Sequence, residues 1–109
     1  MSIVRLYETT LSCNPMEFKE LLLRFGKVVV VVDNLENDFS RTLQLGEKLI
    51  AEPGRPTISA AKRYIIGMKG KLIYSRVMQK RDKSKIYVLG IGEILLSDVQ
   101  IRCNAKKMR

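Results

Sequence analysis

A run of five consecutive valines, residues 28–32, limits the folds available to this chain more than any other segment. β-branched side chains favour extended backbone, and the run does not alternate apolar with polar residues. Strands of this kind are typically covered on both faces and lie in the middle of a sheet. We therefore expect residues 27–33 to form a central strand that anchors a layered core.

A helix is expected just before this strand. Asn14 is a good N-cap, Pro15 suits the first helical position, and Glu17 can complete a capping box. Apolar residues then follow at the spacing of one helix face, and Gly26 can end the helix in a left-handed conformation. The apolar face consists of Phe18, Leu21, Leu22 and Phe25.

Two further helices are predicted downstream. Asn37 or Asp38 can cap a helix that ends at Pro53 and Gly54, and residues 57–64 suit a short third helix. The second helix would place its apolar positions on one stripe. These positions are Phe39, Leu43, Gly46 and Ile50.

The remaining segments read as short strands separated by turns. Together with the helices they predict an α+β fold, with two to three helices packed on one face of a mostly antiparallel sheet of about five strands. The length of 109 residues fits one domain, residues 1–109. Besides the valine run, the expected strands are residues 3–7, 63–66, 71–79, 85–91 and 98–104, with turns at 67–70 and 80–84.

Charge is distributed very unevenly along the chain. The net charge is +9, yet residues 1–54 carry a charge of −2 and residues 55–109 carry +11. Residues 55–85 hold ten Lys and Arg against a single acidic residue, Asp82. A field of this sign attracts phosphate backbones, so we expect the basic C-terminal half to bind nucleic acid.

The expected nucleic-acid interface combines this charge with two tyrosines. Cationic side chains can neutralise phosphates while tyrosine rings stack on unpaired bases, which favours single-stranded DNA or RNA over duplex and implies no strong sequence specificity. A solvated hairpin with half-buried tyrosines is the alternative. The expected nucleic-acid-binding residues are Lys62, Arg63, Lys69, Lys71, Tyr74, Arg76, Lys80, Arg81, Lys83, Lys85 and Tyr87.

Residues 65–73 resemble the IIGxxGxxI core of KH domains. That resemblance implies that residues 67–70 clamp a nucleic-acid backbone and that residues 72–81 form the following helix. The same four residues also suit a hairpin turn. Both interpretations place Lys69 where a phosphate could approach.

Catalysis is the less favoured interpretation. Asp33, Glu36 and Asp38 follow the valine run, as do carboxylates that hold magnesium in nucleases, but capping and strand termination explain them equally well. The chain contains no histidine, which removes Ser-His and Cys-His nucleophile pairs. We expect no enzymatic activity, no cofactor and no metal site, with a magnesium-dependent nuclease as one alternative and a module that binds an acidic protein as the other.

The two cysteines and the apolar segments bear on location. Cys13 and Cys103 lack metal-site spacing, so we expect reduced thiols. No apolar run approaches the ~20 residues of a membrane-spanning helix, and no secretory signal is visible at the N-terminus. These features predict a cytoplasmic protein. An exposed strand at residues 85–91 could pair with a second copy, so a homodimer is a possible assembly.

Overall fold

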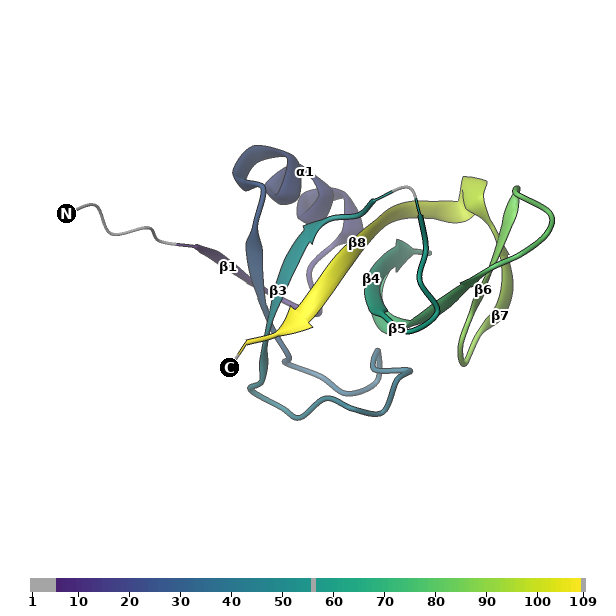
Figure 1. The fold of residues 1–109 in the computed structure, drawn as a ribbon. Helices are drawn as coiled ribbons and strands as arrows, with labels where there is room; N and C mark the ends of the chain where they lie inside the picture. The colour runs from purple at the N-terminus through teal and green to yellow at the C-terminus, as the bar shows by residue number, and fades with distance from the viewer. Residues whose placement is uncertain (1–5, 56, 109) are drawn as a thin grey trace.

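The computed structural model describes residues 6–55 and 57–108, and Figure 1 shows the fold. Within these residues one α-helix, α1 (Pro15–Phe25), packs on one face of an eight-stranded mixed sheet. The sheet order is β1-β2-β3-β8-β4-β5-β6-β7; β1 and β2 are parallel, and the other neighbouring strands are antiparallel. The strands are β1 (Tyr7–Thr10), β2 (Val28–Val31), β3 (Lys48–Pro53), β4 (Arg63–Met68), β5 (Lys71–Gln79), β6 (Lys85–Val88), β7 (Gly92–Leu95) and β8 (Val99–Lys107).

The helix before the valine run is confirmed. The Asn14 side chain accepts a hydrogen bond from the Met16 backbone N–H, and Gly26 ends α1 with a φ of 74°. Of the predicted apolar face, Phe18 and Leu22 are buried and Leu21 is partly buried, whereas Phe25 is 49% exposed. The valine run forms β2 between β1 and β3, so its interior position in the sheet is also confirmed.

The expected fold class is wrong, because the described residues hold one α-helix and eight strands instead of two to three helices and about five strands. The segment assigned to a second helix is a loop, residues 33–47, followed by β3. Phe39 packs with one hydrophobic core and Leu43 with another, so their helical spacing does not mark one face. Arg41 and Gly46 have φ values of 56° and 84°, which a right-handed helix cannot accommodate.

The other differences from the predicted secondary structure also concern strands. Residues 57–62 form turns, and Tyr64 begins a run of buried residues in β4 in place of a third helix. Residues 85–91 divide at the turn around Gly90, so β6 and β7 form a hairpin. The expected first strand at residues 3–7 shares only Tyr7 with β1, and residues 3–5 lie outside the described residues.

Each face of the sheet supports a hydrophobic core. The first core lies between the sheet, α1 and the loop at residues 33–47, and it includes Phe18, Val30 and Leu72. The second lies on the opposite face, where β4 to β7 curl over, and it includes Tyr64, Val77 and Ile86 (Figure 1). Residues that alternate along β4 and β5 therefore face different cores. This alternation decides which charged side chains can share a surface.

Gly67 is required where β4 passes beneath α1. A Cβ atom at this position would lie 2.8 Å from Ile101 Cγ2 and 2.8 Å from Pro15 Cβ, and the register of β4 against β8 shifts here. We expect Gly67→Ala to destabilise the fold by roughly 1–3 kcal/mol, because the added methyl overpacks this contact. Chemical denaturation measures the loss. Adding Ile101→Ala should restore part of the stability in a double-mutant cycle, and strictly additive effects would contradict the proposed clash.

The cysteines and the helix content agree with two further expectations. Cys13 and Cys103 are both free thiols, and burial raises the pKa of the Cys103 thiol to about 12. This thiol is therefore fully protonated at neutral pH. Among the described residues, no helix is both long and apolar enough to cross a membrane.

Candidate nucleic-acid interface

Two arginines face one another at the open end of the β4–β5 hairpin. Arg63 and Arg76 are cross-strand partners, and both lie on the sheet face opposite the buried Tyr64 and Val77. Neither guanidinium forms an ion pair with any described residue. Like charges placed directly opposite one another in a sheet destabilise it by a few tenths of a kcal/mol to about 1 kcal/mol. The pair is therefore a cost to folding that a bound anion would relieve.

The same face continues from the arginines onto β6. Met78 follows Arg76 on β5 and lies opposite Tyr87, and both point away from the second core. Met78 is 50% exposed and Tyr87 is half-buried. Lys85 lies two residues from Tyr87 on the same side of β6. Met78 and Tyr87 thus lie between cationic side chains on β5 and β6, and the exposed Glu93 of β7 lies opposite Tyr87 on its other side.

A pocket adjoins this face where β4 and β8 separate. The ladder between the two strands ends at the pair Tyr64 and Asn104, and the space beyond that pair has a volume of about 560 Å³. Lys62, Arg63 and Lys106 line it. We call the combined surface the basic strip; it consists of Lys62, Arg63, Arg76, Lys80, Lys85 and Lys106 with Met78 and Tyr87.

Ion pairs neutralise only part of the basic strip. Lys80 Nζ lies 3.0 Å from Glu93 Oε1, and this hydrogen bond holds the pKa of Glu93 below its usual range. Hydrogen bonds from Ser84 likewise lower the pKa of Asp82, which lies in the loop between β5 and β6. Lys62, Arg63, Arg76, Lys85 and Lys106 have no ion-pair partner among the described residues.

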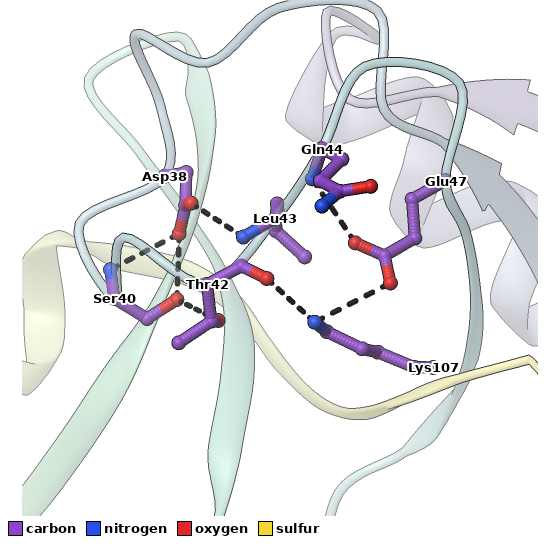
Figure 2. Close-up of polar contacts among 7 residues, drawn as sticks. All are labelled: Asp38, Ser40, Thr42, Leu43, Gln44, Glu47 and Lys107. Carbon is purple, nitrogen blue, oxygen red and sulfur yellow. Dashed lines mark hydrogen bonds and ion pairs between the residues drawn. The ribbon is translucent and has the colours of Figure 1, made fainter.

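The loop at residues 33–47 borders the pocket and is held by two carboxylates, as Figure 2 shows. Asp38 is buried and accepts hydrogen bonds from the Ser40 N–H, the Ser40 hydroxyl and the Leu43 N–H, at 3.1, 2.6 and 2.9 Å. Glu47 accepts from the Gln44 N–H at 3.0 Å and pairs with Lys107 at 3.3 Å. Lys107 also donates to the Thr42 carbonyl oxygen, which ties the loop to β8.

Tyr74 lies beneath this surface and not on it. Its side chain is 3% exposed and belongs to the first core, where its backbone also pairs with Asn37 and Phe39 of the loop. Burial raises the pKa of Tyr74; the nearby Arg63 guanidinium opposes this effect, and the Asp38 carboxylate adds to it. A buried ring cannot stack on a base, so the stacking role expected of Tyr74 is not available in this fold.

The other expected interface residues fall into two groups. Lys69 and Lys71 lie at the turn of the β4–β5 hairpin, five residue pairs and about 17 Å from Arg63 and Arg76. Arg81 and Lys83 lie exposed in the loop between β5 and β6. The structure brings together Lys62, Arg63, Arg76, Lys80, Lys85 and Tyr87 from the expected set.

The segment that resembles a KH core adopts a hairpin. Gly67 and Met68 belong to β4, Lys69 and Gly70 form the turn with φ values of 49° and 74°, and residues 71–79 form β5. The helix implied by the resemblance is therefore wrong, and the hairpin alternative is confirmed.

The three carboxylates of the nuclease alternative do not gather. Among the described residues, no group of three or more His, Cys, Asp or Glu side chains is arranged to hold a metal ion. The pKa of Asp33 is lowered. Slight burial alone would raise it, but hydrogen bonds from Ser12 and Asn34 outweigh that effect. Asp38 points into its own loop, where backbone and hydroxyl donors occupy its oxygens.

Lys106 was missed as an interface residue because the last strand was expected to end at Asn104. In the structure β8 continues to Lys107 and places Lys106 beside Lys62 and Arg63. The signal was present in the sequence, since Ile101, Cys103 and Ala105 keep the period of two.

Comparisons with protein-family models, with curated proteins and with solved structures find no significant match to this chain. The geometry of the basic strip is therefore the main indication of function.

Proposed function

We propose that this protein binds nucleic acid through the basic strip, mainly by phosphate contacts and without strong sequence specificity. The observation that carries the proposal is the cross-strand pair of Arg63 and Arg76, which have no acidic partner among the described residues. Guanidinium groups bind phosphate oxygens in a bidentate geometry, and closely spaced cations match the closely spaced charges of a nucleic-acid backbone. Cytoplasmic location remains part of this proposal.

A preference for single strands is supported by the position of Tyr87. Its ring lies opposite Met78 on an open sheet face, between Arg76 and Lys85. Bases of a single strand are free to stack on such a surface, whereas bases in a duplex are already stacked on one another. The cations would then hold the phosphates on either side of the stacked base.

Replacing Tyr87 with threonine tests this arrangement. We expect Tyr87→Thr to weaken single-strand binding about five-fold or more, because each stacked base contributes about 1–3 kcal/mol, while the affinity for duplex changes little. Fluorescence anisotropy with labelled single-stranded and duplex oligonucleotides measures both affinities.

The matched control is Tyr7→Thr, which also removes a tyrosine from a strand. Tyr7 is 45% exposed but stacks on Phe25 beside α1, and it lies on β1 at the opposite edge of the sheet from β7. We expect this control to bind as the unmodified protein does. Equal losses for both variants, or an unchanged single-strand affinity in Tyr87→Thr, would contradict base stacking on Tyr87.

A further inference from the structure

The pocket at the separation of β4 and β8 differs in shape from the rest of the basic strip. The strip on β5 and β6 is an open sheet surface, whereas this pocket is concave, with a volume of about 560 Å³. A second hollow of about 460 Å³ adjoins it on the side of β3 and shares Lys62, Asn104 and Lys106 with it. The two hollows form one cleft over the end of β8.

Cations outnumber free carboxylates in this cleft. Arg55, Lys62, Arg63 and Lys106 line it and have no ion-pair partner among the described residues. The two carboxylates that line it, those of Glu47 and Glu52, pair with Lys107 and Lys27. The uncompensated charge therefore exceeds what one phosphodiester, with a single negative charge, would neutralise.

The Arg63 guanidinium has no ion-pair partner among the described residues. Its Nε atom is buried and has no hydrogen-bond partner among the described residues. Buried donors in folded proteins are nearly always paired, so the unpaired Nε shows that the described residues do not fix the Arg63 guanidinium through this atom. Because Nε is covered, a phosphate would bind the outer guanidinium nitrogens, which can donate to two of its oxygens at once.

The wall of the cleft is held in place before any ligand binds. The Tyr64 hydroxyl accepts a hydrogen bond from the Ser59 N–H at 2.9 Å, and the Lys62 N–H donates to the Ser59 carbonyl at 3.2 Å. On the other side, Arg102 donates to the Arg55 carbonyl at 2.6 Å and stacks over the Tyr64 ring. Such preorganisation reduces the entropy lost when an anion binds.

From the charge excess, the lack of an ion-pair partner for Arg63 among the described residues and the concave shape, we infer that this cleft binds the terminal phosphate of a nucleic-acid strand. This inference rests on the proposed function, because the remainder of the strand would follow the open part of the basic strip. A terminal phosphate is a monoester with a charge of about −1.5 to −2 at neutral pH, as other phosphate monoesters have. It matches the cleft better than an internal phosphodiester does.

Anisotropy titrations with three versions of one single-stranded oligonucleotide test the inference. One carries a 5′-phosphate, one a 3′-phosphate and one neither. We expect one terminal phosphate to tighten binding about ten-fold relative to the unphosphorylated strand, as one additional bidentate charge-assisted contact would. Inorganic phosphate should compete away that advantage at an ionic strength matched with chloride.

Variants locate the effect. Arg63→Gln and Lys106→Gln should each abolish most of the advantage of the terminal phosphate, and Lys106 is exposed, so its replacement leaves the core intact. Lys71→Gln is the matched control, because Lys71 is an exposed lysine at the far end of the β4–β5 hairpin. It should keep the full advantage.

Equal affinity for all three strands would overturn the inference while leaving the proposed function standing. The same holds if the advantage survives in Lys106→Gln and Arg63→Gln. Binding of only a phosphorylated strand would support the cleft and contradict binding along the open strip, so the two failures are distinguishable.

Discussion

Replacing Arg63 and Arg76 together by glutamine should lower the affinity for a single-stranded oligonucleotide about 100-fold at low salt. Hydrogen bonds to charged groups contribute roughly 1.5–3 kcal/mol each, and about 1.4 kcal/mol corresponds to a ten-fold change in affinity. The dependence of log K on log salt concentration should flatten by about 1.4, because two phosphate contacts are lost from a single strand. Anisotropy titrations over a range of salt concentrations give both quantities.

The matched control for this double variant is Lys69→Gln with Lys71→Gln. It removes the same charge from the same hairpin, about 17 Å away at the turn. The arginine variant should also fold at least as stably as the unmodified protein, because it removes a like-charge pair. An equal loss of affinity in both double variants would mean that net charge, and not the basic strip, determines binding.

Asp38→Ala should destabilise the loop at residues 33–47 far more than replacement of its exposed polar residues does. It removes the acceptor for three donors and leaves the Leu43 N–H buried without a partner. A buried unsatisfied donor costs about 1–3 kcal/mol, and the lost bonds to a charged group add to this, so we expect a total of about 3 kcal/mol. Chemical denaturation should show a lower midpoint with an unchanged m-value.

Asp33→Ala provides the comparison for Asp38. Asp33 is an exposed aspartate of the same loop, and it accepts hydrogen bonds from the Ser12 N–H and from Asn34. Water can replace the lost acceptor at an exposed position, so we expect a loss below about 1 kcal/mol. A loss for Asp38→Ala as small as that for Asp33→Ala would show that the Asp38 hydrogen bonds do not hold the loop.

The sequence predicted those parts of the fold in which local signals agree with tertiary packing. The capped helix at α1 and the interior valine strand are confirmed, because Asn14, Gly26 and the apolar spacing act within one element. The prediction of a second helix was wrong, because the spacing of apolar residues does not reveal in which of two cores each residue packs. Phe39 and Leu43 lie in different cores, and Asp38 forms cap-like hydrogen bonds without a helix.

Charge composition predicted the basic half of the chain but not how the side chains gather. Only strand register places Arg63 opposite Arg76, and only the packing of the loop at residues 33–47 over the first core buries Tyr74 while leaving Tyr87 accessible. Register depends on pairing between segments far apart in the sequence. Lys106 belongs to the basic strip because β8 extends to Lys107. The charged residues at the end of the chain gave no sign that the strand continues that far.

The most direct test of the central claim is the salt dependence of binding between the unmodified protein and a labelled single-stranded oligonucleotide. We predict tight binding at low salt, tighter than for the matching duplex, and a linear fall of log K with log salt concentration. The slope should be about −3.5, as expected if the five cations of the basic strip that have no ion-pair partner among the described residues contact phosphates of a single strand. No binding at low salt, or binding that salt does not weaken, would contradict the proposal that the basic strip is a nucleic-acid interface.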